Sequence, residues 1–117
     1  SETCDESMSD AFPEEFKVLD SDYRIIKPRF SAFFHTSLDL ILRRLGVDTV
    51  ILAGTTTPNC VRSSCYDALS LDYDVIVLSD CTSSVTMQVQ QANLDDMARI
   101  GTRIETLAGL EQILNRA

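Results

Sequence analysis

Two side chains in this sequence have the chemistry of a nucleophilic site: the thiol of Cys60 and the amine of Lys27. Cys60 is predicted to be the third residue of a helix that Thr57 caps and Pro58 opens, directly after the apolar run 49–53. A sulfur in that position lies near the positive end of the helix dipole and near amides without an intrahelical partner, and both favour thiolate. The same amides could bind the oxyanion that develops when a thiolate attacks a carbonyl. A small buried thiol that packs a helix start is the alternative interpretation.

Lys27 strengthens the catalytic interpretation of Cys60. It is one of only two lysines in the chain, and it follows the apolar segment 23–26 instead of lying on a helix surface. The separation of Lys27 from Cys60 matches one strand–helix–strand crossover, so in a parallel sheet both residues lie at the same carboxyl-end edge. An ammonium beside a sulfur stabilises thiolate. The alternative is a lysine that only extends its amine to water.

Short β-branched runs alternate with helical periods from residue 23 onward, and the connections between them are short. This alternation predicts an α/β fold, a three-layer sandwich with a parallel, Rossmann-like sheet. The uninterrupted apolar runs 49–53 and 74–78 are typical of strands buried on both faces. The predicted strands are 23–26, 49–53, 74–78 and 102–106, and the predicted helices are 38–45, 58–69, 84–99 and 107–114.

Composition indicates one compact domain preceded by an acidic segment. The chain has 117 residues, 44% of them hydrophobic, and a net charge of −8. Residues 1–22 hold eight acids and one base, so we interpret 1–22 as an acidic leader and 23–117 as the α/β domain. The absence of a basic face argues against nucleic-acid binding. No apolar run approaches the ~20 residues that span a bilayer, and four cysteines without a Cys-x-x-Cys pair predict free thiols and a cytoplasmic location.

Four segments, taken in order, resemble one known family. They are IIKPRFSAF, TSLDLILRRLGVDTVILAG, TTTPNCV and YDALSLDYDVIVLSD. Together they are similar to the isochorismatase-like cysteine hydrolases, which include nicotinamidases, N-carbamoylsarcosine amidases and ureidoacrylate amidohydrolases. The resemblance extends from about Asp22 to Gly101 and corresponds to the C-terminal part of the family fold.

The resemblance implies a function and assigns roles to residues. In the family a Cys-Asp-Lys triad cleaves a non-peptide C–N bond of a small amide or ureido compound through a thioester, without a cofactor. Its nucleophile matches Cys60 and its lysine matches Lys27. Its oxyanion hole is formed by backbone amides that match Thr56 and Cys60, and its non-proline cis peptide bond matches Thr55–Thr56.

The triad aspartate has no match in this sequence. In the family it lies on an opening strand at the centre of the sheet, and residues 1–22 contain no comparable strand. Three explanations of the missing aspartate stay open. The chain is a piece of a longer or nicked protein, or it is completed by another subunit, or it is a degenerate, non-catalytic oligomerisation module. Asp80, at the end of the run 74–78, is a conceivable local substitute. An uncovered sheet edge and family habit favour a homo-oligomer, with a missing N-terminal segment or a second chain as the other candidate partners.

Other polar and aromatic residues are assigned weaker roles. We expect no metal site, because the zinc-binding histidines of nicotinamidases have no counterpart here. No glycine-rich phosphate loop follows any predicted strand, which argues against nucleotide binding. The candidates for lining a planar substrate are Phe30, Phe33, Phe34 and Asn59, and the three phenylalanines could equally form a subunit interface. His35 is expected on the surface, Cys65 in the core and Cys81 as structural filler near a strand end.

Overall fold

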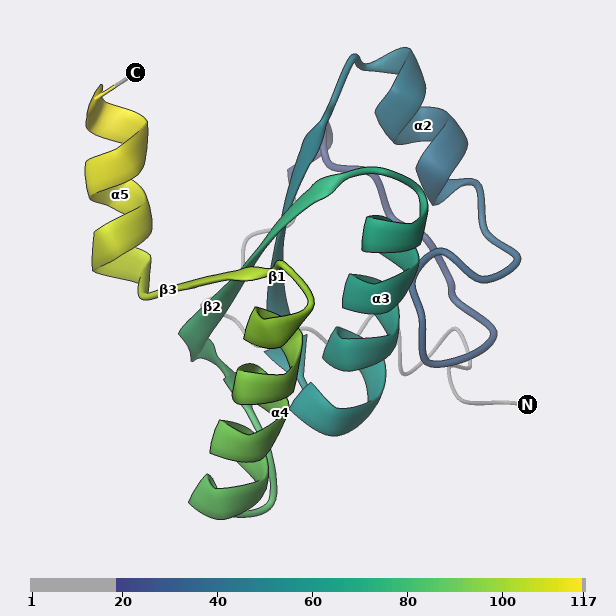
Figure 1. Ribbon diagram of the computed structural model, residues 1–117. Coiled ribbons are helices and arrows are strands. Elements are labelled where there is room, and N and C mark those ends of the chain that lie inside the picture. The colour runs from purple at the N-terminus through teal and green to yellow at the C-terminus, as the bar shows by residue number, and fades with distance from the viewer. Residues whose placement is uncertain (1–18, 117) are drawn as a thin grey trace.

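The computed structural model describes residues 19–116, so most of the predicted acidic leader lies outside the described residues. Its helices and strands follow the predicted order (Figure 1). They are α2 (Leu38–Arg44), β1 (Thr49–Thr55), the π-helical turn η1 (Thr57–Val61), α3 (Arg62–Ser70), β2 (Asp74–Ser83), α4 (Met87–Arg99), β3 (Arg103–Glu105) and α5 (Leu107–Arg116).

The three strands form one parallel sheet in the order β1-β2-β3, which confirms the α/β prediction. The helices α3 and α4 lie side by side against it, and α5 stands apart from them beyond β3 (Figure 1). The strand predicted at 23–26 is wrong, because these residues have no regular secondary structure. A strand requires a neighbour that accepts and donates its backbone hydrogen bonds, and no described strand lies beside this segment.

One face of the sheet carries the hydrophobic core. Val50 of β1 and Val75 and Val77 of β2 pack there with buried residues of α3 and α4. The predicted inward positions of these helices are confirmed. They are Val61, Cys65, Ala68, Leu94 and Met97.

The opposite face is only partly covered. Leu78 of β2 and Leu110 of α5 are buried, and α5 contacts β2. Ile51, which shares this face of β1, is 43% exposed. The prediction that 49–53 is buried on both faces is therefore wrong, because β1 lies at one edge of the described sheet and α5 packs on β2 instead of β1.

The second strand is longer than predicted and contains an irregularity. Leu52 pairs with Val77, but Gly54 pairs with Thr82, so β2 bulges between its two paired stretches. Beyond the bulge, Thr82 and Ser83 continue alongside the end of β1. The following helix begins at Met87, later than the predicted start at residue 84, because the Thr86 side chain caps it by accepting from the Val89 amide at 3.1 Å.

Candidate active site

The structure brings the two predicted reactive side chains together. The Lys27 Nζ donates to the Cys60 Sγ at 3.3 Å and to the Arg29 carbonyl oxygen at 3.1 Å. Both side chains are partly buried, so each still reaches solvent. Lys27 extends from coil and not from a strand end. Its amine nevertheless contacts the Cys60 sulfur beside the carboxyl end of β1, at the edge of the sheet where we predicted the two residues.

One helix supports both halves of this pair. Cys60 lies in η1, which continues directly into α3. Ser64 of α3 is buried, and its Oγ accepts a hydrogen bond from the Ala32 amide at 2.9 Å. That contact ties the segment carrying Lys27 to the helix that follows Cys60, so the amine and the sulfur share a common support.

The turn before Cys60 differs in detail from the prediction. Thr56, not Thr57, is the residue before the helix, and the peptide bond between Thr55 and Thr56 is cis. The Thr56 carbonyl accepts from the amides of Asn59 and Val61 at 3.1 and 3.3 Å. Cys60 is thus the fourth residue of a π-helical turn that follows directly on β1.

Thr57 has a different role from the predicted one. Its side chain is fully buried, and its Oγ1 donates to the carbonyl of Ser83 at the end of β2, 3.1 Å away. It therefore connects the start of η1 to β2 and does not cap the helix. Sequence reasoning missed this contact because only the fold brings Ser83 beside Thr57.

The aromatic candidates do not form one wall. Phe33 packs toward the core, with its ring centroid 5.9 Å from that of Tyr73. Phe30 and Phe34 are exposed, and the Phe34 ring lies edge-on to the imidazole of the exposed His35. Asn59 is exposed and directly precedes Cys60 in η1, so it is the one substrate-lining candidate that adjoins the thiol in the sequence.

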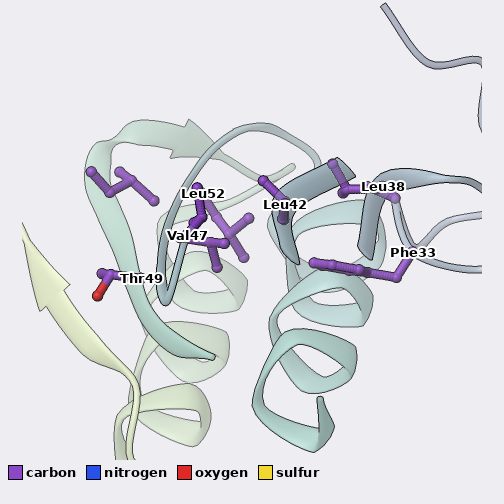
Figure 2. Close-up of a pocket in the computed structure, with 9 residues that line it drawn as sticks. Phe33, Leu38, Leu42, Val47, Thr49 and Leu52 are labelled. Carbon is purple, nitrogen blue, oxygen red and sulfur yellow. The ribbon is translucent and has the colours of Figure 1, made fainter. Parts of the chain in front are cut away.

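Phe33 also lines a pocket beside the sheet edge. This pocket of about 300 Å³ lies between α2 and β1, with Leu38 and Leu42 on the helix side and Thr49 and Leu52 on the strand side (Figure 2). Its lining is almost entirely apolar and includes neither Lys27 nor Cys60. It is a feature of the β1 edge and not of the thiol site.

The other described cysteines, both free, have non-nucleophilic surroundings. Cys65 is fully buried 3.0 Å from the Thr102 hydroxyl, and burial raises the pKa of its thiol. Burial also raises the pKa of the Cys81 thiol, and the adjacent Asp80 carboxylate raises it further. The prediction of Cys65 as a core residue is confirmed.

Asp80 is engaged away from the Cys60 thiol. Its Oδ1 accepts from the Leu107 amide at 3.0 Å, so it caps the start of α5. Among residues 19–116, the side-chain hydrogen bonds of Lys27 and Cys60 include no carboxylate. The described site therefore pairs a thiol with a cation, and Asp80 is not part of it.

Comparison with known proteins agrees with this geometry. Residues 3–109 match the Isochorismatase domain, beyond both ends of the segment that the quoted motifs cover. The chain is 45% identical over 89 residues to a "probable inactive nicotinamidase" of Arabidopsis thaliana, covering 75% of this chain and 45% of that protein. It is 33% identical over 108 residues to a maleamate amidohydrolase of Pseudomonas putida, covering 92% of this chain and 51% of that protein.

A solved structure gives the same result. The isochorismatase-like hydrolase of Alkaliphilus metalliredigens superposes with a TM-score of 0.84 at 41% identity, covering 88% of this chain and 56% of that one. The chain belongs to the isochorismatase family. It spans about half the length of the relatives it matches. No helix in the described part of the chain is long and apolar enough to cross a membrane.

Proposed function

We propose that the protein containing this chain is a cysteine-dependent hydrolase that cleaves the C–N bond of a small amide or ureido compound. The observation that carries the proposal is the 3.3 Å contact between the Lys27 amine and the Cys60 sulfur at the start of a helix. The maleamate amidohydrolase among the relatives supports the amide class of substrate.

The proposed reaction has two stages. The Cys60 thiolate attacks the substrate carbonyl carbon, and a sulfur–carbon bond forms while the carbonyl π electrons move to oxygen. The backbone amides of Thr56 and Cys60 stabilise that oxyanion. When the carbonyl re-forms, the C–N bond breaks and the amine leaves with a proton from an acid. Water then hydrolyses the thioester and restores the thiol.

The acid that supplies this proton comes, in our proposal, from outside residues 19–116. The family resemblance implies an opening strand at the centre of the sheet as its source. Among described strands β1 pairs only with β2, so we propose that the strand carrying the acid pairs with the other edge of β1. An intact-mass measurement of the isolated protein, set beside the length of its reading frame, tests whether such a segment exists or a second chain must supply it.

The hydrolase proposal is tested by thiol labelling and turnover. Substoichiometric iodoacetamide should label Cys60 well before Cys65 and Cys81. Cys60→Ser should abolish ammonia release from a panel of amides and ureido compounds, whereas Cys81→Ser, a change at a similarly accessible thiol, should not. Equal labelling of the three described cysteines would contradict the proposal, as would unchanged turnover in Cys60→Ser.

A second candidate is a non-catalytic interaction module of the same fold. The name of the Arabidopsis relative, "probable inactive nicotinamidase", favours it, together with the lack of a described carboxylate at the Lys27–Cys60 pair. This candidate predicts folded protein without turnover and an oligomeric state that Cys60→Ala leaves unchanged. Sedimentation of both forms, alongside the turnover panel, separates the two candidates.

A further inference from the structure

The side chain of Thr57 ties the turn that carries Cys60 to the end of β2. Thr57 donates to the Ser83 carbonyl at 3.1 Å, and the side chain of Thr57 has no exposed surface. Ser83 in turn pairs with Thr55, the residue where β1 ends. The turn is thus held from both sides by the last residue of β2.

The position of Ser83 depends on the bulge in β2. Between two paired positions β1 advances from Leu52 to Gly54 while β2 advances from Val77 to Thr82. The extra residues are closed into a loop by the Thr82 hydroxyl, which donates to the Leu78 carbonyl at 3.0 Å. In a regular register Gly54 would pair with Ser79 and Thr55 with Asp80, so the bulge is what places Ser83 opposite Thr55.

Gln90 of α4 holds the bulge in place. Its Nε2 donates to the Thr82 hydroxyl at 2.9 Å and to the Thr82 carbonyl at 3.3 Å, and only 8% of the residue is exposed. The Gln90 carbonyl oxygen is buried without a hydrogen-bond partner in the described structure. A buried carbonyl oxygen without a hydrogen-bond partner costs free energy. The hydrogen bonds that the Gln90 Nε2 donates to Thr82 therefore offset this cost.

We infer that Thr57 is a positioning residue for the Cys60 turn and that Gln90 supports it by fixing the bulge that presents the Ser83 carbonyl. This inference rests on the proposed hydrolase function. The Thr57 hydroxyl orients the backbone between Thr56 and Cys60, whose amides would hold the oxyanion. The Lys27–Cys60 contact is made from a different segment and does not involve this hydroxyl.

The inference predicts a selective loss. In Thr57→Val the side chain keeps its shape, but the Ser83 carbonyl loses its donor and the turn is free to shift. A small displacement of oxyanion donors costs on the order of tenfold to a hundredfold in rate. A reaction that needs these donors should therefore slow, whereas a reaction that needs only the thiolate should not.

Two probes make this distinction without knowledge of the substrate. 4-Nitrophenyl acetate acylates the thiolate: a sulfur–carbon bond forms, the ester C–O bond breaks, and nitrophenolate leaves with its electron pair after an oxyanion forms. Iodoacetamide alkylates the same thiolate by displacing iodide, with no oxyanion. Rates at Cys60 are measured for both probes at pH 7 by peptide mass spectrometry.

Thr57→Val should slow acetylation of Cys60 by about tenfold or more while alkylation stays within about threefold. Thr57→Ser, which keeps the hydroxyl, should restore acetylation. Thr102→Val is the matched control, since Thr102 is also a buried threonine but contacts Cys65, and it should leave both rates unchanged.

Each contrary result has a distinct meaning. If Thr57→Val alters the ratio of the two rates no more than Thr102→Val does, the positioning role is refuted while the hydrolase proposal stands. The same holds if Thr57→Ser fails to rescue. If wild-type Cys60 is acetylated no faster than Cys81, the proposed function fails, and the positioning role fails with it.

Should Thr57→Val not fold, Gln90→Met tests the inference from the supporting side. Methionine resembles glutamine in shape and removes both the donor contacts and the unpartnered oxygen. It should lower acetylation selectively, as Thr57→Val does, and equal changes in both rates would refute the role of the bulge.

Discussion

Removing the amine of Lys27 should make Cys60 markedly less reactive. The change is Lys27→Met, which keeps an unbranched side chain but removes the charge 3.3 Å from the sulfur. Coulomb's law at that distance gives about 1.3 kcal/mol even with the dielectric constant of water. Since about 1.4 kcal/mol corresponds to a factor of ten, loss of this attraction should lower the rate of alkylation of Cys60 about tenfold. Partial burial of both groups lowers the effective dielectric, so the tenfold figure is a lower estimate.

The assay is iodoacetamide modification of Cys60 under pseudo-first-order conditions at low salt, read at the peptide level. Arg29→Met is the matched control, because Arg29 is an exposed cation two residues away whose guanidinium donates to the Pro28 carbonyl and not to the sulfur. It should change the rate by less than about twofold, as expected for a charge screened by water. An equal loss in both variants would show that general electrostatics, and not the direct contact, sets the reactivity. No loss in Lys27→Met would refute the activated thiol altogether.

Three further predictions concern stability. Burial raises the pKa of Cys65, so the neutral thiol stabilises the fold at pH values below the ordinary thiol pKa. This stabilisation is lost as the pH rises through the raised pKa. When the free energy of unfolding is measured in urea at pH 7 and at pH 9.5, its decrease between the two should be smaller in Cys65→Ala than in wild type. Met97→Ala should cost about 2–5 kcal/mol, because Met97 is fully buried, whereas Met87→Ala, at an 82% exposed position, should cost less than about 0.5 kcal/mol in the same experiment. Thr86→Ala should lower the free energy of unfolding by about 1 kcal/mol through loss of the α4 cap, and a change below 0.3 kcal/mol, roughly the error of such measurements, would contradict that role.

The order of the elements could be predicted from the sequence because local patterns determine it. Gly46 ends α2 with a positive φ of 73°, as its position after a helical period indicates. The inward stripe of α3 follows from helical spacing alone. The contact between Lys27 and Cys60 was also predicted, but from a premise that the structure corrects, because Lys27 follows coil and not a strand.

What the sequence did not reveal depends on contacts between distant segments. Three consecutive threonines suit a helix cap equally well, and the fold decides that Thr57 turns inward to the Ser83 carbonyl. The bulge in β2 depends on its register against β1, and the exposure of Ile51 depends on which neighbour lies over the edge strand. None of these three features can be predicted from the local periodicity of hydrophobic residues.

The geometry of the candidate site therefore depends more on α3, α4 and β2 than on the edge strand β1 from which the reactive turn emerges. Ser64 anchors the Lys27 segment to α3, and the Thr57 hydroxyl anchors the Cys60 turn to β2. The two anchoring partners, Ser64 and Ser83, lie on elements other than β1, so the contact between amine and sulfur does not depend on β1 alone.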